Sequence, residues 1–179
     1  VSSLPDWFFS GLPPHVPVID TSNYYPGLRD PQIAALDEDR TESEGVQEQI
    51  GHPVIKAFNN ILADSLAELG LPEGSRGRLA VAVAGDYPAA VQITMSLVND
   101  TGFDPVFSGS IAESWRQQPC TPSYCCDWEA ATMLRAFPLA KKGEGRARLP
   151  SLYASFGKLG EAPTHEDIID NNRAINWPV

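Results

Sequence analysis

Four short apolar segments, each followed by a stretch of helical character, constrain this chain more than any other feature of its sequence. They are Val16–Asp20, Pro53–Phe58, Leu79–Ala84 and Asp104–Phe107. The third is apolar on both faces, which is typical of a strand inside a covered sheet. Strands that alternate with helices at this spacing predict an α/β fold with a mostly parallel sheet of about four strands and helices on its faces.

The intervening helices are indicated by capping residues and terminal glycines. Thr41 and Glu44 have the spacing of a capping box, for a helix that ends at Gly51. We interpret the acidic stretch 37–48 around them as the solvated surface of that helix. Further helices are expected from Asp30, over 59–70, from Asp86 to Gly102, from Ser110 to Gln118, from Asp127 to Phe137, and over 149–157 and 164–173.

The charge balance excludes some classes of partner. Thirteen Lys and Arg against 23 Asp and Glu leave a net charge of −10. Such a chain repels nucleic acid backbones and anionic membrane surfaces, so we predict neither as a partner. The sequence has no apolar run of the roughly 20 residues that span a bilayer and no basic-then-apolar leader, so we expect a soluble, cytoplasmic protein.

Cys120, Cys125 and Cys126 are an odd number of cysteines without a secretion signal, which argues against a disulfide framework. We expect buried, reduced thiols. A metal or redox site is the alternative, but the three histidines are not at the spacing of a zinc finger, and we predict no metal.

Two of the predicted strands end in polar and aromatic residues, at the sheet edge where open α/β sheets bind ligands. The first runs into the segment 20–25 and the second into the segment 56–60. Asn side chains match a carboxamide such as nicotinamide, and aromatic rings offer flat faces to a ligand ring. The same residues could equally cap turns and pack, and the residue types alone do not decide between these interpretations.

The segments VIDTSNYYP, VIKAFNN, VAVAGDYPAA, GFDPVFSGS and ESWRQQPCTPSYCCD resemble, in order and spacing, the later part of the deazaflavin (coenzyme F420)-dependent NADP reductase family, a group of dinucleotide-binding oxidoreductases. The resemblance extends from about Val16 to Asp127. It implies that residues 1–126 form part of a Rossmann-like NAD(P)-binding domain and residues 127–179 a C-terminal helical extension. It also implies hydride transfer between NADP(H), or NAD(H), and a second acceptor or donor, with coenzyme F420 as a candidate.

The resemblance also assigns candidate cofactor-binding residues. It places the segment 20–25 beside the nicotinamide and the segment 56–60 on the floor where the second substrate meets it. The residues so implied are Asp20, Thr21, Asn23, Tyr24, Tyr25, Lys56, Ala57, Phe58, Asn59 and Asn60. No side chain need act as an acid or base, because the cofactors carry the chemistry. Gly85 and Asp86 are expected to be structural, and Trp115, Arg116, Thr121 and Pro122 are candidates for the far wall or a dimer contact.

The sequence departs from the family at its start, because it has no glycine-rich turn to hold a pyrophosphate. We therefore expect a missing half of roughly 90–100 residues, estimated from the size of βαβ units. This leaves an alternative function: a truncated member or fragment that acts as a non-catalytic or assembly-dependent module, as a homodimer or with a missing N-terminal half. A hydroxy-acid or sugar-acid dehydrogenase is a further interpretation, but its helical domain would not fit in the last forty residues.

Overall fold

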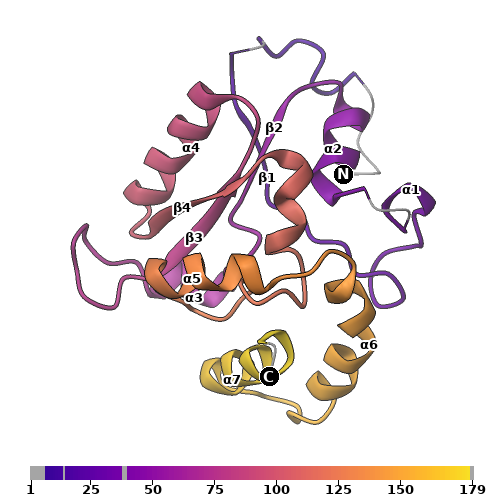
Figure 1. Ribbon diagram of the computed structural model, residues 1–179, viewed down its shortest axis with the longest axis vertical. Helices are drawn as coiled ribbons and strands as arrows, with labels where there is room; N and C mark the ends of the chain where they lie inside the picture. Colours follow the sequence, from indigo (N-terminus) through magenta and orange to yellow (C-terminus); the bar gives the residue numbers. More distant parts are fainter. Residues whose placement is uncertain (1–6, 14, 38–39, 178–179) are drawn as a thin grey trace.

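The computed structural model describes residues 7–13, 15–37 and 40–177, and within them four strands form a single sheet in chain order (Figure 1). The strands are β1 (Val18–Asp20), β2 (Val54–Ala57), β3 (Ala80–Ala84) and β4 (Asp104–Gly109). β1 is parallel to β2 and β3 is parallel to β4, whereas β2 and β3 are antiparallel. The predicted α/β fold with a mostly parallel, four-stranded sheet is confirmed.

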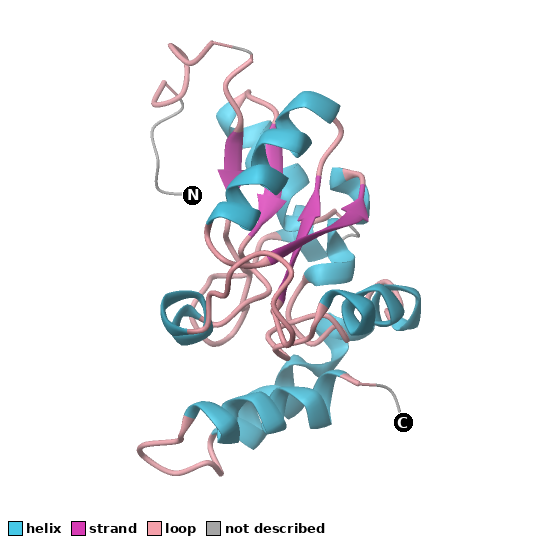
Figure 2. Ribbon diagram, turned by 90° about the vertical axis from the view of Figure 1, so that its left-hand side faces the viewer, coloured by secondary structure: helices cyan, strands magenta, loops and turns pink. Residues whose placement is uncertain are grey.

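Helices cover both faces of the sheet, and the alternation of side chains along each strand decides which residues meet them. Ile55 and Val83 face a core that includes Val98 of helix α4 (Pro88–Asp100). On the other face, Val54 meets Ile50 of helix α2 (Glu42–Ile50), and the core beside β3 includes Met133 of α5 (Ala130–Ala136). The sheet is therefore the middle of three layers (Figure 2).

The remaining helices flank this sandwich. They are α1 (Ala34–Asp37), α3 (Ala63–Glu68), the 3-10 helices η1 (Ile111–Gln117) and η2 (Phe137–Leu139), α6 (Glu144–Phe156) and α7 (His165–Asn176). α6 and α7 pack against each other beyond one end of the sheet (Figures 1 and 2). No helix among the described residues combines the length and the apolar character needed to cross a bilayer.

Local signals predicted some helix ends correctly and others wrongly. The capping box of Thr41 and Glu44 is present and Gly51 closes α2 in the left-handed conformation, as expected. Asp86 does not cap α4; its carboxylate instead accepts from the backbone N–H of Ile111 at 3.2 Å, because the loops after β3 and β4 lie side by side. Gly85 packs so closely that a Cβ atom there would lie 2.4 Å from the side chain of Ile55, which supports a structural role for the Gly85–Asp86 turn.

Further boundaries differ from the predictions. The segment from Ser110 is a 3-10 helix, and Ser110 makes no side-chain cap. The helix expected over 149–157 begins earlier, because α6 starts at Glu144 and continues through Pro150. α3 begins at Ala63 rather than near residue 59, and α5 begins at Ala130 rather than near Asp127. The residues before each helix bond to other parts of the chain, since the carbonyl of Asn60 accepts from Cys125 N and that of Trp128 from Ala80 N. The division at residues 126 and 127 stays a prediction.

Candidate functional site

A groove of about 410 Å³ lies where β1 and β2 end. Three loops form its walls: the segment after β1, the segment between β2 and α3, and the segment before Asp127. The residues that line it are Thr21, Asn23, Phe58, Asn59, Ile61, Leu62, Ala63, Leu66, Tyr124 and Cys125. The lining is mostly apolar with a few amide and hydroxyl groups, which is the usual character of a small-molecule site.

Beneath the loops of the groove, a fully buried lysine binds two buried carboxylates. The Nζ atom of Lys56 lies 3.1 Å from Asp20 Oδ2 and 3.3 Å from Glu42 Oε2, and it donates to the backbone carbonyl of Ser22. Asp20 and Lys56 meet because they are paired in the β1–β2 register and point to the α2 face. The ammonium thus fixes the loop after β1 to both the sheet and α2.

The two carboxylates differ in ionisation. Burial acts to raise the pKa of Asp20, but the charge of Lys56 and hydrogen bonds from Ser22 and Ser43 outweigh it and hold that pKa below its ordinary value. Burial is the largest effect at Glu42, and it raises the pKa of this carboxyl despite the nearby ammonium. Because Asp20 and Glu42 share one lysine, their charges are not both fully compensated, and Glu42 is the carboxyl whose ionisation is less favourable.

This difference predicts opposite pH effects on stability. The lowered pKa of Asp20 stabilises the fold above its unfolded pKa, near 4, and that contribution is lost as the pH falls through the folded value. The raised pKa of Glu42 acts in the reverse direction, its contribution being lost as the pH rises through its folded pKa. We expect Asp20→Asn to cost about 2 kcal/mol at pH 7, and Glu42→Gln, which keeps an acceptor for Tyr24, to cost less than about 1 kcal/mol. Urea unfolding of both variants from pH 2.5 to 8 measures this; an equal loss at pH 7 would contradict it.

A second buried network joins the groove to η1 through amides. Asn59 donates to Asn23 Oδ1 at 3.0 Å and to the backbone carbonyl of Gln117 at 2.7 Å. The side-chain oxygen Oδ1 of Asn59 accepts from Gln117 Nε2 at 2.9 Å. Asn23 returns a hydrogen bond of 2.9 Å to the backbone carbonyl of Asn59. Asn59 is therefore a buried positioning residue that holds Asn23 at the edge of the groove.

The third wall belongs to a segment, residues 119–126, whose residues are all buried. Helix α7 holds it from outside: Asn172 donates to the carbonyl of Cys125 and Asn176 to that of Tyr124, each at 2.8 Å. From inside, the carbonyl of Asn60 accepts from Cys125 N at 2.9 Å. Burying a loop requires such partners for its backbone, and asparagines supply them here.

The three cysteines of this region are free and buried, as the sequence predicted. Burial raises the pKa of Cys120 and of Cys126 to about 12, and raises the pKa of Cys125 as well. Because the thiolate is the reactive form, we expect all three thiols to resist Ellman's reagent at pH 8 and to react together in denaturant. Rapid labelling of any thiol in the folded protein would contradict this expectation.

The structure brings the candidate cofactor-binding residues to one end of the sheet but at different depths. Thr21 is exposed, while Asn23, Tyr25 and Phe58 are half-buried; the buried ones are Asp20, Tyr24, Lys56, Ala57, Asn59 and Asn60. Thr21, Asn23, Phe58 and Asn59 line the groove. Tyr25 instead points its hydroxyl at that of Tyr124, and Tyr24 lines a neighbouring hollow of about 440 Å³ between the segment 22–36 and α2.

Some residues of the site were not predicted from the sequence. Glu42 and Ser43 were assigned to a solvated helix surface, which is wrong: both are buried against Lys56 and Asp20. Gln117, which bonds to Asn59, was not predicted either. It is followed by Gln118, and no sequence signal shows which of the two glutamines belongs to the site. Trp115 and Thr121, candidates for a far wall, line a different pocket. No group of three or more metal-ligating side chains occurs within the described residues.

Comparisons with known proteins identify one strong relative. The chain is 95% identical over 109 residues to the Escherichia coli (strain K12) protein named "Putative protein YjhV", and the match covers 61% of this chain and 80% of YjhV. No family model matches the sequence.

Two solved structures are similar at low TM-scores. A hypothetical protein, SMa0349, from Sinorhizobium meliloti has a TM-score of 0.45 at 30% identity over 55% of this chain. A "putative f420 dependent nadp-reductase" from Arthrobacter sp. FB24 has a TM-score of 0.44 at 20% identity over 82% of this chain. The chain spans about half the length of these two proteins, 46% and 54%.

Proposed function

We propose that this chain, which belongs to the family of the Escherichia coli protein YjhV, acts in an oxidoreductase. In this proposal the enzyme transfers a hydride between NADP(H) and a second acceptor or donor, with coenzyme F420 as a candidate. The observation that carries the proposal is the groove at the ends of β1 and β2. It is built from the two segments whose sequences resemble the deazaflavin-dependent NADP reductases.

The groove suits the nicotinamide end of a dinucleotide. Thr21 is exposed and offers its hydroxyl to a ligand. The side-chain nitrogen of Asn23 carries two hydrogens; it donates one to the backbone carbonyl of Asn59, and the other is available to a ligand. These groups can orient a carboxamide, while Phe58 and the apolar residues at the start of α3 exclude water from the ring. Bound NADP(H) supplies the hydride, so the task of these side chains is to align it with the acceptor.

The same lining does not suit the phosphates of the dinucleotide. The described residues that line the groove include no charged side chain. Phosphates need basic side chains or a helix N-terminus, so other residues or another chain must hold them. The proposal therefore includes a nucleotide-binding half, which holds the phosphates and completes the site.

The alternative, an assembly-dependent module without catalysis, is favoured by one feature of the sheet. β1 pairs with β2 on one side and has no second strand partner among the described residues. An open edge of this kind accepts a further strand from another segment or a second copy. A homodimer through this edge is the corresponding proposal for the quaternary structure.

Titration with reduced nicotinamide mononucleotide and with NADPH, followed by nicotinamide fluorescence, tests the function. We expect both to bind and Thr21→Val to weaken both by about tenfold, the effect of about 1.4 kcal/mol. Thr132→Val, on α5 outside the groove, is the matched control and should change neither. Coenzyme F420 or another hydride acceptor is then added, and NADPH oxidation is followed by absorbance.

The outcomes separate the two functions. Binding of neither nucleotide, with the fold intact by circular dichroism, would contradict the oxidoreductase and favour the module. Light scattering then tests the module directly, because a monomer at all concentrations would contradict assembly through β1.

A further inference from the structure

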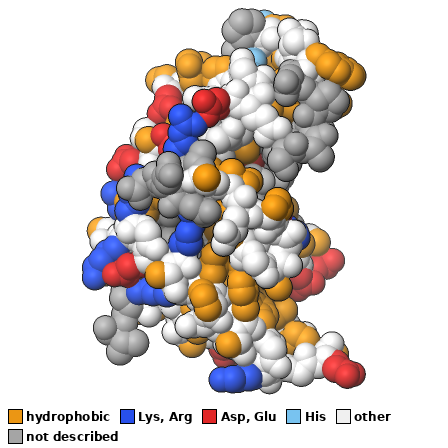
Figure 3. All heavy atoms as spheres, turned by 90° about the vertical axis from the view of Figure 1, so that its right-hand side faces the viewer, with side chains coloured by type: hydrophobic (Ala, Val, Ile, Leu, Met, Phe, Trp, Pro, Cys, Tyr) orange, Lys and Arg blue, Asp and Glu red, His pale blue; other side chains and the backbone are white. Residues whose placement is uncertain are grey.

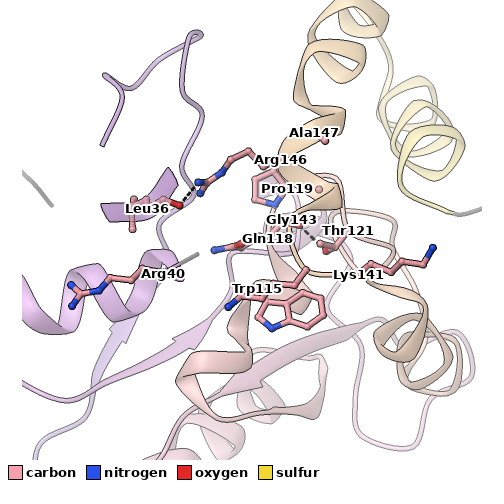
Figure 4. Close-up of a pocket in the computed structure, with 12 residues that line it drawn as sticks. Leu36, Arg40, Trp115, Gln118, Pro119, Thr121, Lys141, Gly143, Arg146 and Ala147 are labelled. Carbon is pink, nitrogen blue, oxygen red and sulfur yellow. Dashed lines mark hydrogen bonds between the residues drawn. The ribbon is translucent and has the colours of Figure 1, made fainter. Parts of the chain in front are cut away.

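A pocket of about 270 Å³, separate from the groove, lies between the end of η1 and the start of α6 (Figure 4). We call it the basic pocket, because four of its lining residues are Arg40, Lys141, Lys142 and Arg146. Trp115 and Gln118 line it from η1 and its C-cap, and Leu36 of α1 and Arg40 line it from the segment before α2. It shares no lining residue with the groove.

The concentration of positive charge here runs against the composition of the chain. The chain has 13 basic residues in 179 and a net charge of −10, yet four of the 13 line one small pocket, and the described residues that line it include no Asp or Glu. Lys and Arg side chains also gather at mid-height on the molecular face shown in Figure 3. Such a local excess attracts an anion despite the repulsion from the whole molecule.

The basic side chains are partly engaged, which positions them. Arg40 pairs with Glu48, and Lys141 with Glu144 at 3.2 Å. Arg146 donates to the carbonyl of Leu36 and lies 5.3 Å from the ring centre of Tyr24. Lys142 is exposed and forms no ion pair with another described residue.

The backbone at this point adds hydrogen-bond donors. Gly143, the N-cap of the 13-residue helix α6, makes no side-chain cap, so the first-turn N–H groups have no capping side chain. Gly143 and Gly145 both line the pocket. Gly143 is exposed with open space beside it, whereas Gly145 is buried against the carbonyl of Pro119, so a ligand reaches this backbone from the side of Gly143. A helix N-terminus attracts anions through these donors and through the helix dipole.

A buried donor points to a ligand independently of the helix. The Nε2 atom of Gln118 is buried and has no hydrogen-bond partner among the described residues. In Figure 4 this nitrogen points toward the Leu36 and Arg40 side of the pocket. An unsatisfied buried amide is destabilising, and an acceptor atom in the pocket would remove that cost.

We propose that the basic pocket binds a phosphorylated small molecule. Its phosphate lies at the N-terminus of α6 beside Lys142 and accepts from Gln118 Nε2, and its apolar part contacts Trp115. The pocket volume fits a small ligand, and the net charge of the protein disfavours a nucleic acid in its place. This inference does not depend on NADP(H) binding in the groove.

Isothermal titration with inorganic phosphate and with glycerol phosphate tests the site. We expect saturable binding of one molecule per chain, and glycerol phosphate to bind at least as tightly as phosphate because it also contacts Trp115. Lys142→Gln should weaken both by about tenfold, and Gln118→Met, which keeps the side-chain length but removes the donor, by about fivefold. Lys158→Gln, at an exposed position near the other end of α6, is the matched control.

Several results would overturn the proposal. One is the absence of saturable binding of either probe up to about 10 mM, a weaker affinity than a built phosphate site gives. Another is equal weakening by Lys142→Gln and Lys158→Gln, which indicates diffuse attraction. A third is binding of a phosphoserine peptide but of neither small probe. Lys142 is exposed, so its variant keeps the test valid even if Gln118→Met does not fold.

Discussion

Replacing Lys56 by methionine is expected to lower the free energy of unfolding by about 3–5 kcal/mol, the cost of removing one partner from a buried ion pair. Methionine fills a similar volume, so the loss isolates the charge. Lys56 is fully buried, and its ammonium is within ion-pair distance of Asp20 and Glu42. Without it, two buried carboxylates and the carbonyl of Ser22 lose their shared donor.

Urea unfolding at pH 7 measures the effect. Lys158→Met, at an exposed site, is the control and should change the free energy of unfolding by less than about 0.5 kcal/mol. Adding Asp20→Asn and Glu42→Gln to Lys56→Met should recover part of the stability, because the uncompensated charges are then removed. A loss below about 1 kcal/mol for Lys56→Met would show that the cluster is open to water.

The second large effect is expected for Asn59→Leu, at about 3 kcal/mol, because the change removes a hydrogen-bond partner from three buried or half-buried groups at once. The groups that lose a hydrogen bond are Asn23 Oδ1, Gln117 Nε2 and the carbonyl of Gln117. Leucine keeps the branching and the number of side-chain heavy atoms of asparagine, although its two methyl groups take up more volume. The variant should also weaken nicotinamide binding, since Asn23 loses the partner that orients it.

Asn171→Leu on α7 is the matched control. Its Nδ2 atom is buried without a partner among the described residues, so leucine there breaks no hydrogen bond of that nitrogen. We expect its free energy of unfolding to stay within about 1 kcal/mol of the parent value. Equal losses in the two variants, measured by urea unfolding, would indicate that the Asn59 network contributes nothing beyond side-chain packing.

The sequence predicted the strands well, because each is a short apolar run with few competing interpretations. It predicted the α2 capping box for the same reason: the signal is local. The antiparallel pairing of β2 and β3 was not predicted, since strand direction depends on how the intervening chain packs. Composition also misassigned Glu42, because an acidic residue in an acidic helix is normally exposed and only the position of Lys56 on the neighbouring strand explains its burial.

Candidate site residues could be located but not ranked by depth. The resemblance to the reductases brought the segments 20–25 and 56–60 to one place, and the structure also places them at one end of the sheet. It could not show that Asn59 is buried beneath Asn23, because that follows from contacts with Gln117, 58 residues further along the chain. Long-range polar networks of this kind have no local signature.

The buried segment 119–126 has a consequence for any two ligands of this molecule. It contributes Tyr124 and Cys125 to the groove and Pro119 and Thr121 to the basic pocket, while Asn60 and α7 hold it in one conformation. An occupant that orders or shifts this segment from one side changes the cost of binding on the other. By thermodynamic reciprocity, any change that one ligand makes in the affinity for the other is returned by the same factor, so titrating one hollow with the other occupied measures whether the shared segment couples them.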